Sequence, residues 1–263
     1  MSTFSRRSVL AVLGVAALPG VVAVGGRSAF AADAYSSNLA LYADPALVEG
    51  VDYGRRFRRH AAQDDSDAGG SGFPDTAVVA LHGGGIEPGT SELCLAVSGY
   101  HPATGVATGG AVYDYWLFEG LRSSGNAELH VTSKNCDDPV ALATVAGSRR
   151  TVSLHGCTPA EAGLPASAAA VLVGGLDTVL KAALIEAYQD HGIQAIDAAG
   201  LPDLNGDEPG NIVNRGLRGA GVQLELTTPL RTQMFGVNTR AGRKSSTLPL
   251  FWAFVDATRL ALT

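Results

Sequence analysis

Cysteine is scarce in this chain of 263 residues, which contains only Cys94, Cys136 and Cys157. None of them belongs to a C-x-x-C pair, so a zinc ribbon is not expected. Cys94 lies inside an apolar helical pattern, where a free thiol behaves as a small buried hydrophobic group.

Long apolar runs and dominant basic blocks are also missing after the first 31 residues. No run there approaches the roughly 20 residues that span a bilayer, so no membrane association is expected once the N-terminal segment is removed. The chain has 25 acidic and 19 basic residues and a formal net charge of −6 at pH 7. This balance argues against nucleic acid as the main partner, and a polyanionic substrate would need a local basic pocket. The basic cluster at residues 55–59 is expected to be a solvated strand or loop face rather than a contact for an anionic polymer.

The N-terminal segment has the features of an export signal. Arg6 and Arg7 form a twin-arginine pattern, and an Ala/Val/Gly-rich run follows them. Pro19 interrupts this run, which disfavours the alternative of a retained membrane anchor. Cleavage near Ala31 or Ala32 would remove residues 1–31 by the twin-arginine route and leave a secreted or cell-envelope protein.

Export would place the cysteines in an oxidising compartment, where one disulfide and one free thiol are expected. Cys136 and Cys157 both follow predicted strands. We therefore expect these two cysteines to pair.

From residue 76 onward, segments typical of strands and helices alternate. Apolar runs predict strands at 77–82, 112–118, 128–132, 151–155, 169–173, 194–196 and 222–226. Helical patterns intervene at 91–97, 139–145, 177–191, 208–218 and 248–262. This alternation predicts one α/β domain over residues 32–263, with a mainly parallel or mixed sheet and helices on both faces.

The most informative segment is HGGGIEPGTSE at residues 82–92, directly after the apolar run 77–81. It places the His82 imidazole and the Glu87 carboxylate near the end of a strand, with three glycines that let the backbone turn back between them. Imidazole and carboxylate suit zinc, and a catalytic zinc needs only one more protein ligand. The alternative is a glycine-rich turn with a solvated acid and an incidental histidine.

Two further polar residues follow or interrupt apolar strands. His155 ends one predicted strand and is the natural third zinc ligand, because chemistry in α/β sheets gathers at the carboxyl ends of strands. The alternative is a structural histidine whose hydrogen bonds are satisfied within the fold. Glu225 lies inside another apolar strand, where a carboxylate is costly to bury without a partner or a role. It is either an outward-facing residue or the general base of a zinc enzyme.

Asn214 and Arg215 form a third candidate group. A guanidinium can hold a carboxylate through two hydrogen bonds, and an amide can add another. The pair would suit a substrate with a free carboxylate, and the alternative is a surface ion pair at a helix end.

Several motifs occur in the order and spacing of a known family. They are residues 49–53, 82–92, 153–157, 173–177, 211–215 and 221–226. Together they resemble the phage-type poly-γ-glutamate hydrolase family, and the resemblance runs from about Leu47 to the C-terminus. It implies a zinc-carboxypeptidase-like fold, a twisted mixed sheet flanked by helices, and hydrolysis of γ-amide links with one zinc ion per chain.

The resemblance assigns roles to the same side chains. It makes His82, Glu87 and His155 the metal ligands, Glu225 the general base, and Asn214 with Arg215 the residues that hold a substrate carboxylate. Glu225 would take a proton from zinc-bound water and pass it to the leaving amine.

Other functions remain open at this stage. The same zinc site could belong to a peptidase or deacylase that acts on γ-glutamyl peptides of the cell wall or on small acylated amino acids. A secreted module that binds a polymer without cutting it is the alternative from another class. A binding module has no need of a buried Glu225, which favours the enzyme.

Overall fold

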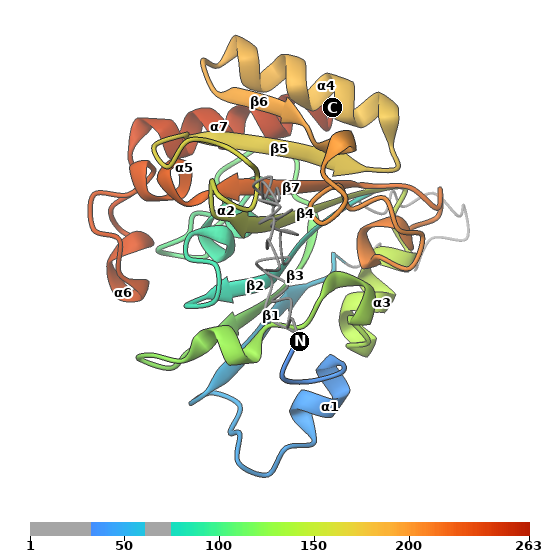
Figure 1. Cartoon of the computed structure of the whole chain (residues 1–263), viewed down its shortest axis with the longest axis vertical. Helices are drawn as coiled ribbons and strands as arrows, with labels where there is room; N and C mark the ends of the chain where they lie inside the picture. The colour runs from blue at the N-terminus through green and yellow to red at the C-terminus, as the bar shows by residue number, and fades with distance from the viewer. Residues whose placement is uncertain (1–32, 61–74) are drawn as a thin grey trace, which may run out of the picture.

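A seven-stranded mixed sheet forms the centre of the computed structural model, which describes residues 33–60 and 75–263 (Figure 1). The strand order across the sheet is β1-β3-β2-β4-β7-β5-β6. The strands are β1 (Tyr53–Arg58), β2 (Thr76–Gly84), β3 (Asp114–Gly120), β4 (Arg150–Cys157), β5 (Ala170–Gly175), β6 (Gln194–Asp197) and β7 (Val222–Thr227). The export signal predicted at residues 1–31 lies outside the described residues.

The directions of the strands place three carboxyl ends together. β2 is parallel to β3 and to β4, and β4 is parallel to β7. The antiparallel pairs are β1 with β3 and β5 with β7. The neighbouring strands β2, β4 and β7 therefore end at one edge of the sheet, where ligands of open α/β sheets bind.

Helices cover both faces of the sheet. They are α1 (Asn38–Tyr42), α2 (Thr90–Val97), α3 (Pro139–Ala146), α4 (Thr178–Asp190), α5 (Thr228–Gln233), α6 (Arg240–Arg243) and α7 (Pro249–Ala261). Alternate residues of β2 enter two different cores: Val78 and Ala80 pack with α2, α4 and α7, whereas Val79 and Leu81 pack with α1 and α3. Figure 1 shows α4 and α7 near β5 and β6, and α1 toward the β1 end. The prediction of a single α/β domain with a mixed sheet and helices on both faces is confirmed.

Two predicted elements are wrong. Residues 128–132 are no strand, because a 3₁₀ turn at Asn126–Leu129 precedes an irregular segment. Residues 208–218 contain only the 3₁₀ turn Ile212–Asn214 instead of a helix. Asn211 caps this turn through its own side chain, which accepts a hydrogen bond from the backbone N–H of Val213 at 3.1 Å, a local bond that competes with helix formation.

The predicted disulfide is also wrong, because Cys136 and Cys157 are free buried thiols. Cys136 packs in the core beside α3, and Cys157 packs in a separate apolar cluster with Leu172 and Leu204. Cys94 is fully buried in α2, as its apolar surroundings predicted. In residues 33–60 and 75–263, no helix combines the length and apolar character needed to cross a membrane.

Candidate metal centre

A tight loop after β2 brings Glu87 back toward His82. The backbone N–H of Glu87 donates to the carbonyl of His82 at 2.7 Å. Gly83 leaves no room for a side chain, since a Cβ there would lie 2.1 Å from Ser91 Oγ. Gly84 has a φ of +67°, which other residues rarely adopt. The glycines therefore allow the loop to fold back so that the two side chains meet.

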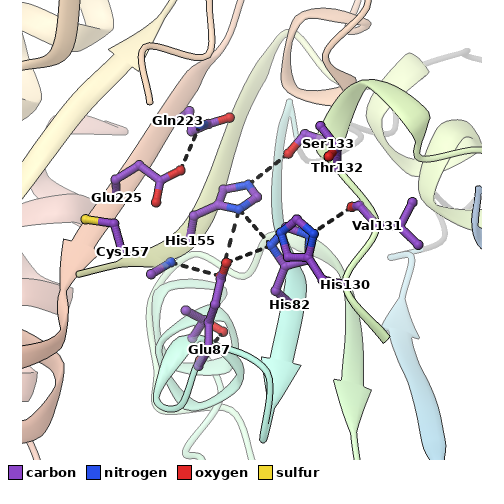
Figure 2. Close-up of polar contacts among 12 residues, drawn as sticks. His82, Glu87, His130, Val131, Thr132, Ser133, His155, Cys157, Gln223 and Glu225 are labelled. Carbon is purple, nitrogen blue, oxygen red and sulfur yellow. Dashed lines mark hydrogen bonds and ion pairs between the residues drawn. The ribbon is translucent and has the colours of Figure 1, made fainter. Parts of the chain in front are cut away.

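His155, at the end of β4, completes a group of three facing side chains (Figure 2). His82 Nδ1 lies 2.9 Å from Glu87 Oε1 and 3.1 Å from His155 Nδ1. His155 Nδ1 lies 3.9 Å from Glu87 Oε2. Two imidazole nitrogens and a carboxylate that face one another within 4 Å form the kind of donor set that zinc takes in catalytic sites.

Atoms of His82, Glu87 and His155 also form polar contacts with surrounding residues. His82 Nε2 lies 2.9 Å from the carbonyl oxygen of Val131, and His155 Nε2 lies 3.3 Å from Ser133 Oγ. Glu87 Oε2 accepts a hydrogen bond from the backbone N–H of Gly156 at 2.9 Å. Such outer partners fix the orientation of metal-binding side chains and leave the inward Nδ1 atoms of the two histidines available.

Burial and charge set the protonation of this group. Burial lowers the pKa of His155 to about 3, so this ring is neutral at physiological pH and has a free lone pair. Burial opposes the charged form of His82 too, but the charge of Glu87 and its hydrogen bond raise the pKa of His82. Burial likewise opposes ionisation of Glu87, yet His82 holds the pKa of Glu87 below its usual value. A cation that replaces the proton between His82 and Glu87 would find both groups ready to bind it.

Glu225 lies beside this group on β7, directly opposite His155 in the sheet register. Its Oε1 accepts a hydrogen bond of 2.9 Å from Gln223 Nε2, and Asn211 Nδ2 in turn donates to Gln223 Oε1 at 2.8 Å. Burial, with the nearby charge of Glu87, raises the pKa of Glu225 well above its ordinary value. A carboxyl group with a raised pKa can accept and return a proton near neutral pH.

A cavity of about 260 Å³ opens over these side chains. Its lining includes His82, Glu87, His155 and Glu225 together with an acidic loop at residues 202–208. The other lining side chains are His130, Thr132, Ser133, Lys134, Asn211 and Gln223. The four residues predicted as ligands and base thus share one accessible hollow.

His130 is a site residue that the sequence reasoning did not single out. Its ring stacks on the His82 ring with centroids 3.8 Å apart, and its Nδ1 lies 2.7 Å from Asp33 Oδ1. Potential ligand atoms of His82, Glu87 and His130 lie within 4.8 Å of one another, so a second three-residue set overlaps the first. We favour His155 over His130, because the inward Nδ1 of His155 faces both His82 and Glu87, whereas His130 is stacked on His82 and bonded to Asp33.

Asn214 and Arg215 do not line the cavity. Asn214 Nδ2 donates to the carbonyls of Gly206 and Glu208, and its Oδ1 accepts the backbone N–H of Gly221. Arg215 Nη1 and Nη2 donate to the carbonyl oxygens of Cys136 and Lys134. Their role as a substrate clamp stays a prediction. In the structure, both side chains donate to carbonyls of neighbouring loops.

The chain matches one family model and is similar to several known proteins. Residues 70–257 match the family model described as poly-gamma-glutamate hydrolase. The chain is 34% identical over 179 residues to UPF0714 protein YndL of Bacillus subtilis (strain 168), covering 68% of this chain and 64% of YndL. It is 35% identical over 178 residues to the SPbeta prophage-derived UPF0714 protein YoqZ of the same organism, covering 68% of this chain and 58% of YoqZ. The chain therefore spans less than two thirds of the length of these two curated relatives.

Solved structures show the same similarity. A bacteriophage poly-gamma-glutamate hydrolase superposes with a TM-score of 0.71 at 30% identity, over 88% of this chain and 97% of that chain. Zinc-free YndL superposes with a TM-score of 0.70, also at 30% identity, over 88% of this chain and 98% of that chain.

Proposed function

Because this chain belongs to the poly-γ-glutamate hydrolase family, we propose that it is a zinc-dependent hydrolase of γ-glutamyl amide bonds, with poly-γ-glutamate as its substrate. The observation that supports this most is the meeting of His82, Glu87, His155 and Glu225 in one cavity at the carboxyl ends of β2, β4 and β7. Zinc-free YndL among the similar structures supports the choice of metal.

The donor set fits a single catalytic zinc. His82 and His155 would bind through Nδ1, and Glu87 through its carboxylate, while their outer atoms remain bonded to Val131, Ser133 and Gly156. Three protein ligands leave one position open, as catalytic zinc sites require. When bound, zinc would polarise the scissile carbonyl and an attacking water molecule.

Glu225 would act as the general base. It lines the same cavity, and its raised pKa suits a group that takes a proton from the attacking water and later delivers it to the leaving amine. Gln223 holds one carboxylate oxygen of Glu225 through its amide N–H. The second carboxylate oxygen is then the one to carry the proton.

A specific observation favours a second candidate substrate. The cavity lining includes the exposed acids Asp203, Asp207 and Glu208. Among the described residues, Lys134 is the one lysine or arginine in this lining, and it pairs with Glu208 at 3.3 Å. These acids repel a polyanion and attract a free amine. A γ-glutamyl peptide whose next residue carries an amino group, as in cell-wall peptides, would therefore fit this cavity with less repulsion than the polymer.

One assay separates these substrates. The zinc-loaded protein is incubated with poly-γ-glutamate, with α-linked polyglutamate and with a γ-glutamyl-lysine peptide, and newly formed amino groups are measured. We expect new amino groups to form from the γ-linked polymer and none to form from the α-linked one. Cleavage of the peptide alone would replace the polymer by the second candidate, and no cleavage of either γ-linked substrate would contradict the proposed function.

A further inference from the structure

Arg231 is a buried cation that lies outside the cavity lining. It sits on α5, just after β7, and only 6% of the residue is exposed. Its Nε donates to the carbonyl of Leu226 at 3.0 Å, and its Nη1 donates to that of Pro88 at 3.0 Å. Its Nη2 donates to the carbonyl of Cys157 at 3.4 Å and to Thr228 Oγ1 at 3.2 Å. Its partners in the described residues are thus neutral oxygens.

The three carbonyls come from the three segments that carry the site. One belongs to the residue after Glu87, one to the residue after Glu225, and one to the second residue after His155. A single planar guanidinium therefore connects the β2 loop, the end of β4 and the end of β7. Only arginine has donors spread widely enough to reach three such positions at once.

Gly156 shows how closely this connection approaches the ligands. A Cβ on Gly156 would lie 2.5 Å from Arg231 Cζ, so the guanidinium packs directly against this glycine. The backbone N–H of Gly156 in turn donates to Glu87 Oε2 at 2.9 Å. A displacement of the Arg231 guanidinium would therefore move Gly156, and with it the N–H group that holds the Glu87 carboxylate.

We propose that Arg231 is a positioning residue that fixes the spacing of Glu87, His155 and Glu225 by holding the backbone beside each of them. This inference rests on the proposed zinc-hydrolase function. Arg231 does not reach the substrate, and its effect comes from the geometry of its donors rather than from its charge alone. Outer partners of metal ligands typically contribute about 10–100-fold to metal affinity or activity.

The test replaces Arg231 by lysine, which keeps the charge and loses the spread of donors. The matched control is Arg259→Lys, because Arg259 on α7 also donates to two backbone carbonyls, those of Val97 and Ala111, each at 2.7 Å. Zinc affinity is measured by competition with a chromophoric chelator, and kcat and KM are measured on the cleaved γ-linked substrate.

We expect Arg231→Lys to weaken zinc binding or lower kcat by at least about 10-fold, with KM changed by less than about threefold. Arg259→Lys should leave zinc affinity and kcat at the wild-type values. If Arg231→Lys does not fold, Thr228→Val takes its place, because it removes the hydroxyl that holds the guanidinium and donates to the Cys157 carbonyl at 3.2 Å. A smaller change in the same direction is then expected.

If Arg231→Lys changes zinc affinity and kcat no more than Arg259→Lys does, the positioning role is overturned and Arg231 has a purely structural role. The wild-type protein is measured first, so a failure of the proposed function is seen separately. Wild type that binds no zinc contradicts both the function and this inference. Wild type that binds zinc without cutting a γ-linked substrate contradicts the function alone, and the zinc affinities of the variants still decide the role of Arg231.

Discussion

At the scale of one residue, the burial of Glu225 supports its proposed role as the general base. Its carboxyl is buried, its pKa is raised by that burial, and its hydrogen-bonding side-chain partner is Gln223. A buried acid without a cationic partner in contact destabilises the fold when it ionises. The cost is understandable if the group moves a proton during catalysis.

The first prediction concerns the rate of Glu225→Gln. The variant should bind zinc like the wild type and lose at least about 100-fold in kcat, the usual contribution of a general acid–base. Zinc titration and initial rates of amine release check the two parts. A variant that keeps nearly the full rate would show that Glu225 is not the base.

The same substitution has an expected effect on stability. Since the pKa of Glu225 is higher in the folded protein than in the unfolded chain, the folded state binds more protons above the ordinary carboxyl pKa, and stability falls as pH rises through that range. Glu225→Gln should therefore raise Tm at pH 8 and change it little at pH 4, measured with chelator present. A gain of about 1 kcal/mol corresponds to roughly 2–4 °C in a domain of this size.

The next prediction separates the two overlapping ligand sets. If zinc is held by His82, Glu87 and His155, the variant His155→Gln should lose zinc affinity by more than about 100-fold, because a three-ligand site loses one ligand. His130→Gln should change it by less than about 10-fold, since His130 would then be only a neighbour. Competition with a chelator measures the zinc affinity of both variants. A larger loss of affinity in His130→Gln than in His155→Gln would make His130 the third ligand in place of His155.

The sequence indicated most of these residues through their positions. His82, His155 and Glu225 each stand at the end of, or inside, an apolar run, so the pattern that predicted the strands also placed the side chains at one edge. His130 and Arg231 carried no such signal. His130 lies inside residues 128–132, which were predicted as a strand but are irregular after the 3₁₀ turn Asn126–Leu129. Arg231 binds backbone carbonyls, and such contacts cannot be recognised from a side-chain pattern.

At the scale of elements, the buried strands were predicted from the sequence more readily than the exposed ones. β2, β5 and β7 are buried along their whole length and were predicted from their apolar runs. β1 is an edge strand with an exposed arginine-rich face, so it was expected only as a solvated strand or loop face. The predicted helix at 208–218 failed because local side-chain bonds, such as that of Asn211, hold the backbone in turns.

Helix α3 offers a prediction at this scale, because Asp138 caps its N-terminus through its side chain. Asp138 Oδ1 accepts the backbone N–H groups of Val140 and Ala141 at 2.8 and 2.9 Å, and its Oδ2 accepts from Tyr42 and Arg55. Asp138→Ala should lower the free energy of unfolding by about 2 kcal/mol, through loss of the cap and of partners for two side chains.

Thermal or urea unfolding measures this loss, with Asp138→Asn as the control that retains an oxygen able to cap the helix. Zinc affinity should be the same in all three proteins, because none of the Asp138 partners is a proposed ligand. A loss of zinc affinity in Asp138→Ala would show that α3 supports the metal centre as well.

At the scale of the whole molecule, charge limits how a polymer can reach the site. The chain is acidic, with a formal charge of −6, and the cavity lining includes three exposed acids. Long-range attraction therefore would not bring poly-γ-glutamate to this protein. Binding would depend on zinc itself and on short-range contacts inside the cavity.

The most direct test of the proposed zinc hydrolase is the size distribution of poly-γ-glutamate after incubation with the protein, with and without a zinc chelator. We expect the zinc-loaded protein to shorten the polymer, the chelated protein to leave it intact, and added zinc to restore the shortening. Glu225→Gln loaded with zinc is the matched control and should leave the polymer intact. Shortening that persists in full after the zinc has been removed would contradict a zinc hydrolase built on His82, Glu87 and His155.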